Sequence, residues 1–382
     1  MEFRFYHPGT VIFKDNAIDM VGEYASKLGD NVMLVTGRRF ARRYGYIDRI
    51  KGLLEESGLT VYVFDRVIPN PTFDNVREGV SEAKRRGIDV FVAFGGGSAM
   101  DAAKAISVVY SLGGDVQDYV YPTIVEDEIR PIIAMPTTAG TGSEVTKYSV
   151  LIDDSNVKTV IVGEPLIPKV ALLDPSVLRH MSPELTGWTG FDALSHAFES
   201  YFGRRSNVLT ELYSFKAIEI IFQHLPDAVR GDPNSREKVF YASMLAGFAI
   251  NISGTNIAHG LGYYLTTDYN LHHGLANALI LPWAVEFCSL VEPDKFQRLA
   301  KVVSFSTGRS VEDVSGLVES ILRLMKECNI PTSLTELGIP FNDLDKMVEA
   351  SHRYERNLSN SPRKPTLEEV KDIYIKAFKR SK

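Results

Sequence analysis

Short runs of apolar, mostly β-branched residues alternate with amphipathic stretches in the first half of the chain. Four such runs predict strands at about 32–36, 61–64, 90–94 and 132–135. The intervening stretches, about 39–57, 73–87 and 98–112, repeat apolar residues every three or four positions, which is the helical period. Continuous apolar strands separated by helices indicate a parallel sheet that is covered on both faces.

The pattern changes after about residue 180, where strand signals end and long helical patterns begin. These patterns cover 183–203, 208–230, 235–252, 273–291, 294–307, 311–328 and a stretch from about 366. We therefore expect an α/β domain with a parallel, Rossmann-like sheet over residues 1–181, followed by an all-α domain over 182–382. Two short runs, Phe3–Tyr6 and Val11–Phe13, predict an edge hairpin suited to forming a homodimer.

Composition and charge exclude several classes of protein. Apolar residues make up 45% and charged residues 24%, which are globular proportions that exclude disorder. The net charge of −6 and the lack of Lys and Arg runs argue against a nucleic-acid partner.

The apolar runs and the cysteines predict where in the cell the protein is located. We expect no membrane partner, because no apolar stretch approaches the roughly 20 residues that span a bilayer, and the N-terminus does not resemble a signal peptide. The two cysteines, Cys288 and Cys328, are expected to be buried thiols, which suits a cytoplasmic protein. The scarcity of glutamine beside many Arg and Glu residues hints at a thermophilic source.

Two loops at the ends of predicted strands carry the features of a phosphate-binding site. Gly95-Gly96-Gly97-Ser98 joins a buried strand directly to a helix, whose N-terminus offers unpaired N–H groups to an anion. Met100 replaces the last glycine of the usual G-x-G-x-x-G, so a plain tight turn is the alternative. The segment Pro136–Glu144 clusters Thr, Gly and Ser after the next strand, although such residues also build ordinary turns. Two such loops on adjacent strand ends favour a dinucleotide.

A carboxylate and several histidines in the second half suggest a metal ion. Asp192 and His196 are four residues apart in a predicted helix and so share one face. His259, His272 and His273 follow in segments of small and apolar residues. A single histidine there would be a satisfied core residue, but several of them beside a carboxylate favour a site for Fe²⁺, Zn²⁺, Mn²⁺ or Co²⁺. The absence of thiolate ligands argues against structural zinc.

In combination these motifs resemble the iron-containing, or group III, alcohol dehydrogenases along essentially the whole chain. The resemblance is carried by Pro69-Asn70-Pro71, Gly95-Gly96-Gly97-Ser98 with Asp101, Pro136–Glu144, Leu173-Asp174-Pro175, Asp192-Ala193-Leu194 with His196 and Glu199, and His273-Gly274 with Ala276-Asn277. It implies reversible hydride transfer between a small primary alcohol or diol and its aldehyde. It also implies that Fe²⁺, or Zn²⁺, is held by Asp192, His196, His259 and His273.

The resemblance further implies where the nicotinamide coenzyme binds. The implied contacts are Asn70, Gly95, Gly96, Gly97, Ser98, Asp101, Thr137, Thr138, Ser143, Lys158 and Leu178. Relatives that prefer NAD often carry an Asp just after the second-strand Thr, whereas here Gly37 occupies that position and Arg38 and Arg39 follow. Glycine leaves room for a 2′-phosphate and arginine pairs with it, so we expect NADP(H) to be favoured over NAD(H). The alternative is that the two arginines merely open a solvated helix.

One position departs from the family pattern. Many members carry a histidine four residues after the third metal ligand, where this chain has Tyr263. Tyr263 or His272 would then move the proton, or both residues would pack against the wall of the site.

Three other functions fit parts of the pattern. A glycerol-dehydrogenase-like enzyme fits less well because the Asp192–His196 pair is intact. A dehydroquinate-synthase-like lyase fits less well because the histidine segments lack Lys and Arg. A nucleotide-binding protein without turnover fits less well because the motifs are complete.

Overall fold

The computed structural model describes residues 3–379, and the chain divides into two compact units. The sheet unit consists of Arg4–Thr138 and Gly142–Arg179. The helical unit contains the chain from His180 onward together with Ala139–Thr141. The middle of the Pro136–Glu144 loop therefore belongs to the helical unit and its two ends to the sheet unit.

The sheet unit is built on six parallel strands in the order β1-β8-β5-β4-β2-β3. Their bounds are β1 (Thr10–Phe13), β2 (Asn31–Gly37), β3 (Thr60–Val67), β4 (Val90–Gly95), β5 (Ile132–Pro136) and β8 (Val170–Leu173). Strands β4 and β5 are buried along nearly their whole length, as their unbroken apolar runs predict. The predicted parallel sheet is confirmed.

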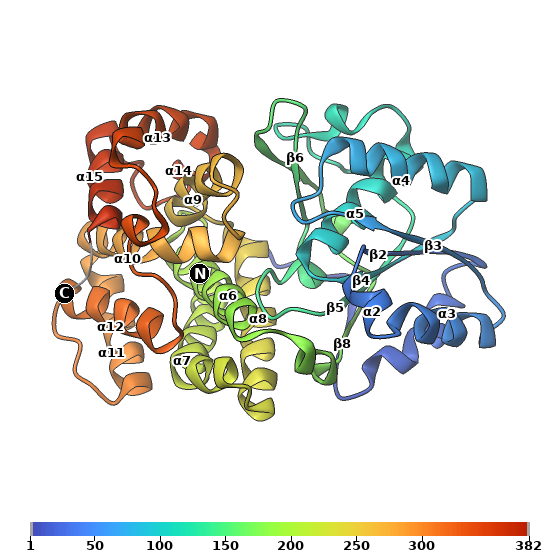
Figure 1. Ribbon diagram of the computed structural model, residues 1–382, viewed down its shortest axis with the longest axis horizontal. Coiled ribbons are helices and arrows are strands. Elements are labelled where there is room, and N and C mark those ends of the chain that lie inside the picture. Colours follow the sequence, from blue (N-terminus) through green and yellow to red (C-terminus); the bar gives the residue numbers. More distant parts are fainter. Residues whose placement is uncertain (1–2, 380–382) are drawn as a thin grey trace. The chain divides into compact units, whose positions relative to one another are not determined.

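Helices cover both faces of this sheet (Figure 1). α4 (Phe73–Arg86) and α5 (Gly97–Leu112) lie on one face, and α2 (Phe40–Arg43) and α3 (Tyr46–Glu56) lie on the other. The short α1 (Val21–Ala25) packs against α3. The helix predicted at 39–57 is in fact two helices, because Gly45 adopts a left-handed φ of 73° between them.

The edge hairpin predicted from Phe3–Tyr6 and Val11–Phe13 is wrong. β1 pairs in parallel with β8, with Thr10 opposite Val170, and residues 3–8 form no strand. The homodimer expected from that hairpin therefore loses its basis. The antiparallel pair of this unit is instead β6 (Tyr148–Ile152) with β7 (Lys158–Val162), which the apolar pattern did not predict.

The helical unit contains ten α-helices among the residues that the structure describes. They are α6 (Pro183–Phe202), α7 (Val208–Arg230), α8 (Pro233–Ser253), α9 (Ile257–Asp268), α10 (His273–Val291), α11 (Pro293–Thr307), α12 (Val314–Glu327), α13 (Leu344–Ala350), α14 (Glu355–Leu358) and α15 (Leu367–Phe378). All the predicted helices are present. α9, which carries His259, was not predicted, since Gly260 and Gly262 weaken its helical pattern.

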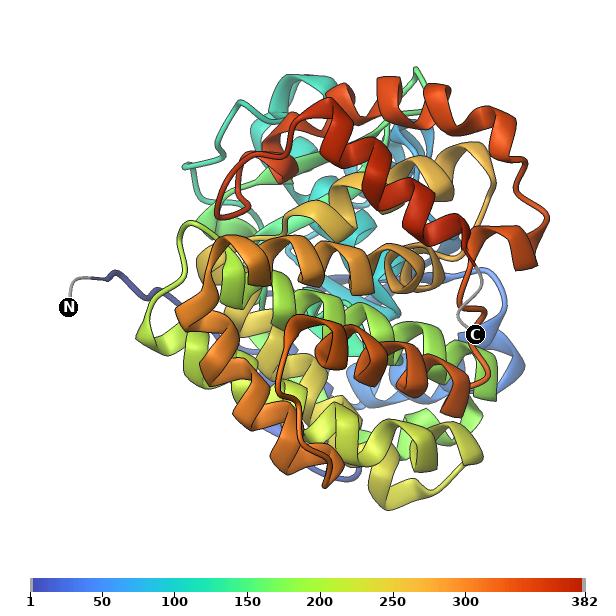
Figure 2. The same cartoon turned by 90° about the vertical axis from the view of Figure 1, so that its left-hand side faces the viewer.

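Helix α10 corrects the expectation that no apolar stretch approaches a membrane-spanning length. By length and composition alone its 19 residues would suffice to cross a membrane. In this structure 72% of that apolar window is buried, and α10 packs against α6, α9, α12 and α15 (Figure 2). The apolar composition of α10 is thus that of a core helix. Cys288 of α10 and Cys328 are buried free thiols, as predicted.

Candidate active site

Four side chains from three helices meet inside the helical unit. Asp192 and His196 lie one turn apart on α6, His259 lies on α9, and His273 is the first residue of α10. The ligand atoms of Asp192, His196 and His259 lie within 4.8 Å of one another. Asp192 Oδ1 is 3.6 Å from His259 Nε2 and 3.7 Å from His273 Nε2. The structure thus brings together all four residues that the resemblance implies.

Two glycines let these helices approach closely. A Cβ on Gly274 would lie 2.0 Å from the carbonyl oxygen of Trp188 and 3.3 Å from Asp192 Cβ, so α10 can begin against α6 only with glycine there. A Cβ on Gly262 would lie 2.4 Å from Asn277 Oδ1, which in the same way ties α9 to α10. The small residues around the histidines are therefore a packing requirement of the cluster.

The imidazole rings are oriented by hydrogen bonds to their outer nitrogens. His196 Nδ1–H donates to the carbonyl oxygen of Gly140 at 3.2 Å. His259 Nδ1 pairs with the carboxylate of Glu199, which is buried on α6. When Nδ1 carries the proton, the lone pair of Nε2 is free for a metal ion. In their neutral form both rings therefore leave Nε2 available.

Glu199 and Asn277 are site residues whose roles the sequence did not reveal. Asn277 Nδ2 donates to Asp192 Oδ1 at 2.8 Å and lies 3.1 Å from His259 Nε2 and 3.2 Å from His273 Nε2. Both residues belong to the motifs, and the spacing of Glu199, three residues after His196, was a usable signal because it places the two on one helix face.

Charge within the cluster suits a divalent cation. Burial raises the pKa of Asp192, but the neighbouring imidazoles outweigh it and hold that pKa well below its usual range. Burial lowers the pKa of His196. Burial also lowers the pKa of His259, but Glu199 and Asp192 outweigh it and raise that pKa to about 9. A metal ion binding here would therefore displace a proton from His259. One carboxylate with several imidazoles fits Fe²⁺ or Zn²⁺.

The two candidates for proton transfer flank His273. The ring of Tyr263 stacks on His273 with centroids 5.5 Å apart, and burial raises the pKa of its phenol. His272 caps the N-terminus of α10, where its Nδ1 accepts the N–H of Gly274 at 3.2 Å. The ring of His272 also lies 5.1 Å from that of Trp188.

In the sheet unit, the glycine loop and the threonine loop meet at adjacent strand ends. Gly95 ends β4 opposite Pro136, which ends β5. A Cβ on Gly95 would lie 2.7 Å from Ala99 Cβ, and one on Gly96 would lie 3.2 Å from Thr138 Oγ1. Thr137 N–H donates to the Gly95 carbonyl at 2.9 Å.

Asn70 and Ser98 extend this group, because the backbone N–H of Asn70 donates to Ser98 Oγ at 3.2 Å. The loop residues that the resemblance implies are thus gathered at the carboxyl edge of the sheet, together with the start of α5. Helix α5 begins at Gly97, directly after β4. That is where parallel α/β sheets bind phosphates.

Asp101 and Ser143, two further residues that the resemblance implies, are hydrogen-bonded to each other. Ser143 Oγ donates to Asp101 Oδ1 at 2.7 Å, and the N–H of Val150 donates to Asp101 Oδ2 at 3.2 Å. Burial raises the pKa of Asp101. The charge of Lys158, at the start of β7, acts on the same carboxyl group. These contacts attach the 143–150 segment to α5.

Lys104 completes this attachment and was missed by sequence reasoning. It is fully buried, and its Nζ donates to the carbonyl oxygens of Ser143, Thr146 and Tyr148 at 2.6, 2.8 and 2.9 Å. Burial lowers its pKa to about 8. A charged residue in the most apolar helix of the sheet unit was the signal. Leu178, the last of the implied contacts, is buried in the short helix η5 (Pro175–His180).

The proposed coenzyme-selecting residues lie at a topological switch point. β2 and β4 are neighbours in the sheet, but the next strand after β2 is β3 on one side of this pair, and the next strand after β4 is β5 on the other side. Open α/β sheets bind nucleotides at such a point. Gly37 ends β2, and the exposed residues Arg38 and Arg39 follow it. The nearby Arg42 is already paired with Asp65.

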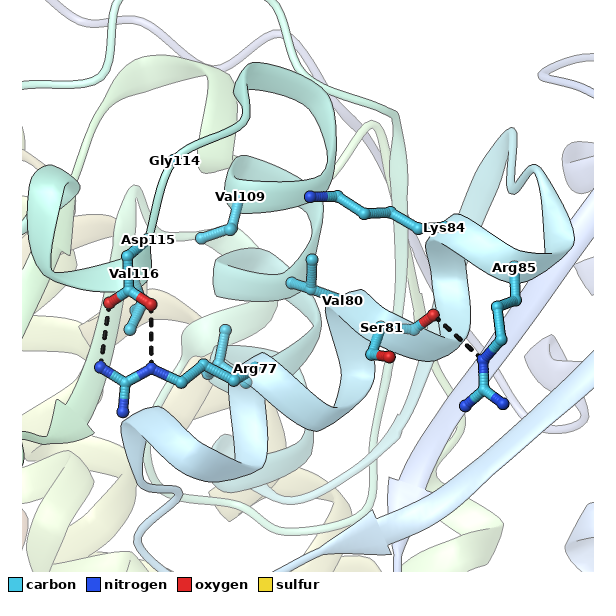
Figure 3. Close-up of a pocket in the computed structure, with 10 residues that line it drawn as sticks. Arg77, Val80, Ser81, Lys84, Arg85, Val109, Gly114, Asp115 and Val116 are labelled. Carbon is cyan, nitrogen blue, oxygen red and sulfur yellow. Dashed lines mark hydrogen bonds and ion pairs between the residues drawn. The ribbon is translucent and has the colours of Figure 1, made fainter.

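A separate pocket of about 370 Å³ opens between α4 and α5, on one face of the sheet (Figure 3). Four valines contribute to its lining, and the lining residue Arg77 pairs with Asp115. Arg77 also pairs with Asp154. None of the implied coenzyme or metal residues lines it, so it is distinct from the site described above.

Comparison with known proteins places the chain in a family. Residues 8–175 match the iron-containing alcohol dehydrogenase model, and residues 186–378 match the C-terminal domain of the same family. This protein belongs to the iron-containing alcohol dehydrogenase family. Membership makes it an NAD(P)-dependent oxidoreductase that interconverts alcohols and aldehydes, which confirms the predicted family, fold class and reaction class.

Individual relatives match over almost their full length. The chain is 35% identical to 1,3-propanediol dehydrogenase of Citrobacter freundii, covering 98% of this chain and 99% of the relative. The structure of a 1,3-propanediol oxidoreductase superposes with a TM-score of 0.92 at 34% identity, over 99% of this chain and 100% of the other.

Two further relatives, each 31% identical, differ in coenzyme. One is the NAD-dependent methanol dehydrogenase of Bacillus methanolicus, covering 98% of this chain and all of the relative. The other is the NADPH-dependent butanol dehydrogenase of Clostridium saccharobutylicum, covering 97% of each chain. Family membership therefore leaves the coenzyme open.

Proposed function

We propose that this enzyme interconverts small primary alcohols or short diols and their aldehydes at a divalent ion, Fe²⁺ or Zn²⁺, held by Asp192, His196, His259 and His273. The observation that carries the proposal is the convergence of these side chains in one cluster of the helical unit. Relatives named for propanediol and butanol support the size of the substrate.

Neighbouring groups hold the proposed ligand atoms in position before the substrate binds. A bound ion would polarise the alcohol or aldehyde oxygen and so favour hydride transfer. The Gly140 carbonyl and the Glu199 carboxylate hold His196 and His259 in the orientation that a ligand needs. Asn277 fixes the carboxylate of Asp192. Burial of Asp192, His196 and His259 keeps water from competing for those atoms.

For proton transfer we propose His272 rather than Tyr263. An imidazole titrates near neutral pH, which suits a group that must both accept and return a proton. The raised pKa of the Tyr263 phenol keeps it protonated, and its ring is stacked on His273, which is a packing role.

We propose NADP(H) as the preferred coenzyme, bound at the glycine and threonine loops. The residues assigned to it are Gly37, Arg38, Arg39, Asn70, Gly95–Ser98, Asp101, Thr137, Thr138, Ser143, Lys158 and Leu178. Among these, Asp101 and Ser143 would act by holding the loop, as their mutual hydrogen bond supports. Arg39 makes no ion pair within residues 3–379 and is exposed, so its charge is available for a 2′-phosphate.

A panel of alcohols and aldehydes tests the proposal on protein reconstituted with Fe²⁺ or Zn²⁺, with each coenzyme in turn. We expect turnover of C3–C4 alcohols or diols only in the metal-loaded protein, with a higher kcat/KM for NADPH than for NADH. Turnover that does not depend on metal would overturn the proposal. A clear preference for glycerol would favour the polyol dehydrogenase instead, and conversion of a phosphorylated sugar acid without net coenzyme reduction would favour the lyase.

A further inference from the structure

Glu199 is a buried carboxylate of the metal cluster that lies one turn beyond His196 on α6, outside the set of four proposed ligands. Its side chain is 3% exposed, and each of its two oxygens has its own partners. Oε1 accepts the backbone N–H groups of Asn256 and His259, both at 3.1 Å. Oε2 pairs with His259 Nδ1. One carboxylate therefore binds both the beginning of α9 and the ring that α9 carries.

The backbone contacts fix which way this carboxylate faces. The two N–H groups belong to the N-cap residue and the first turn of α9, where N–H groups lack intrahelical partners and require an acceptor. The Asn256 side chain adds a second link, because its Nδ2 donates to the main-chain oxygen of Glu199 at 2.9 Å. With Oε1 committed to the backbone, Oε2 is the only carboxylate atom left to face His259.

We infer that Glu199 is a positioning residue that sets the tautomer of His259. An acceptor at Oε2 requires the proton of the neutral ring to be on Nδ1, which leaves the Nε2 lone pair directed at Asp192 and the ion. The inference rests on the proposed function, because it assigns a task within that metal site. In known metal sites, removing such an outer carboxylate typically lowers metal affinity 10–100-fold.

The isosteric variant Glu199→Gln tests this inference sharply. Its amide oxygen must remain on the two backbone N–H groups, because these need an acceptor, so its NH₂ group must face His259 Nδ1. A donor at that point favours the wrong tautomer, with the proton on Nε2. We expect the Kd for Zn²⁺ or Co²⁺, measured by chelator competition, to rise about 10–100-fold. The visible spectrum of the Co²⁺-loaded protein should change as well.

A matched control separates this effect from a general loss of structure. Glu336 of the same unit also accepts hydrogen bonds from a backbone N–H and a hydroxyl group, but far along the chain from the ligands. Glu336→Gln should leave the metal Kd unchanged, and the far-ultraviolet circular dichroism spectrum of metal-free Glu199→Gln should match that of the native protein. An unchanged metal Kd in Glu199→Gln overturns the inference. If the native protein itself binds no metal, the proposed function fails too, so the two failures are distinguishable.

A measurement on the unmodified protein covers the case in which the variant does not fold. Nitrogen-15 NMR of histidine in the Zn²⁺-loaded protein reports which ring nitrogen of His259 carries the proton. We expect Nδ1 to be protonated and Nε2 to show the shift of a metal-bound nitrogen. Protonation on Nε2 contradicts the inference directly.

Discussion

The candidate metal cluster of the helical unit and the candidate coenzyme loops of the sheet unit are built from different kinds of chemical group. The candidate metal cluster consists of side chains, with four groups from three helices brought close together. The coenzyme loops consist largely of backbone, in which glycines and small hydroxyl residues connect strand ends to the next element. A side-chain site fails when one group is removed, whereas a backbone site fails only when the segment that carries it moves.

Buried charges illustrate the same difference. In the helical unit, Asp192 and Glu199 act on the histidines of the cluster. In the sheet unit, Lys104 and Asp101 act on the backbone of the 143–150 segment. A buried charged residue thus marks the candidate metal cluster in one unit and the support of a loop in the other.

Removing one proposed ligand should disrupt the candidate metal cluster of the helical unit and leave the candidate coenzyme loops intact. We expect His259→Ala or His273→Ala to lower kcat/KM by at least about 10³-fold, because the metal is lost and with it the polarisation of the substrate. Metal analysis of the purified variants should show far less than one ion per chain, while NADPH binding measured by fluorescence stays nearly unchanged. The exposed His352→Ala is the control. A His259→Ala variant with a full metal content and full activity would refute the assignment.

Removing Lys104 should disrupt the candidate coenzyme loops of the sheet unit and leave the candidate metal cluster intact. Lys104→Met leaves three buried carbonyl oxygens without their cation, so we expect the free energy of unfolding to fall by about 4 kcal/mol and the KM for coenzyme to rise. Metal content should not change. Urea unfolding and coenzyme titration measure these effects, with Lys84→Met on the exposed face of α4 as the control. Equal losses in the two variants would show that the contacts of Lys104 do not matter.

The sequence predicts the side-chain cluster of the helical unit better than the contacts that support the loops of the sheet unit. The residue types and four-residue spacing of Asp192 and His196 predict a metal site, because ligands are chosen by chemistry and a helix fixes their geometry. The support by Lys104 could not be predicted, because its partners are backbone carbonyls some 40 positions away, which carry no residue signature. Likewise α9 escaped prediction because its glycines serve close packing, Gly262 at Asn277 and Gly260 at Asn357, at a cost to helical propensity.

Glu144 should give the sheet unit a pH dependence of its own. Burial raises the pKa of Glu144 to about 7, and its Oε1 has no hydrogen-bond partner among the described residues. A pKa above that of the unfolded chain means that this group stabilises the fold below about pH 4.5 and that the contribution is lost as the pH rises through 7. We expect a loss of up to about 3 kcal/mol between pH 5 and pH 7.5.

The variant Glu144→Gln isolates that contribution, since a neutral amide cannot ionise. Its free energy of unfolding, measured with urea at pH 5 and at pH 7.5, should fall less between the two values than that of the native protein. The exposed Glu126→Gln should show the same fall in the free energy of unfolding between these pH values as the native protein. If the free energy of unfolding of Glu144→Gln falls as much as that of the native protein, Glu144 is ionised in the fold throughout this range.

Coenzyme preference should change by a smaller factor. A side chain fits at position 37, where the nearest atom to a new Cβ would be the Val67 carbonyl oxygen at 3.7 Å. Gly37→Asp would repel a 2′-phosphate, so we expect the ratio of kcat/KM for NADPH to that for NADH to fall about tenfold, or about 1.4 kcal/mol. Gly52→Asp on α3 is the control, because it adds the same charge to the same unit at a position where a new Cβ would meet no atom within 4 Å. It should leave the ratio unchanged. A native protein that already prefers NADH would contradict this assignment.

The smallest effect is expected at the residue that departs from the family pattern. Tyr263→Phe keeps the ring that stacks on His273 and removes only the hydroxyl, so we expect kcat to fall less than about threefold. His272→Ala should lower kcat about 10²-fold, as for the loss of a general acid–base group, and should remove one limb of the pH profile. The reverse order of effects would assign the proton to Tyr263. It would also mean that the phenol acts on the substrate despite its raised pKa, as the acid for aldehyde reduction.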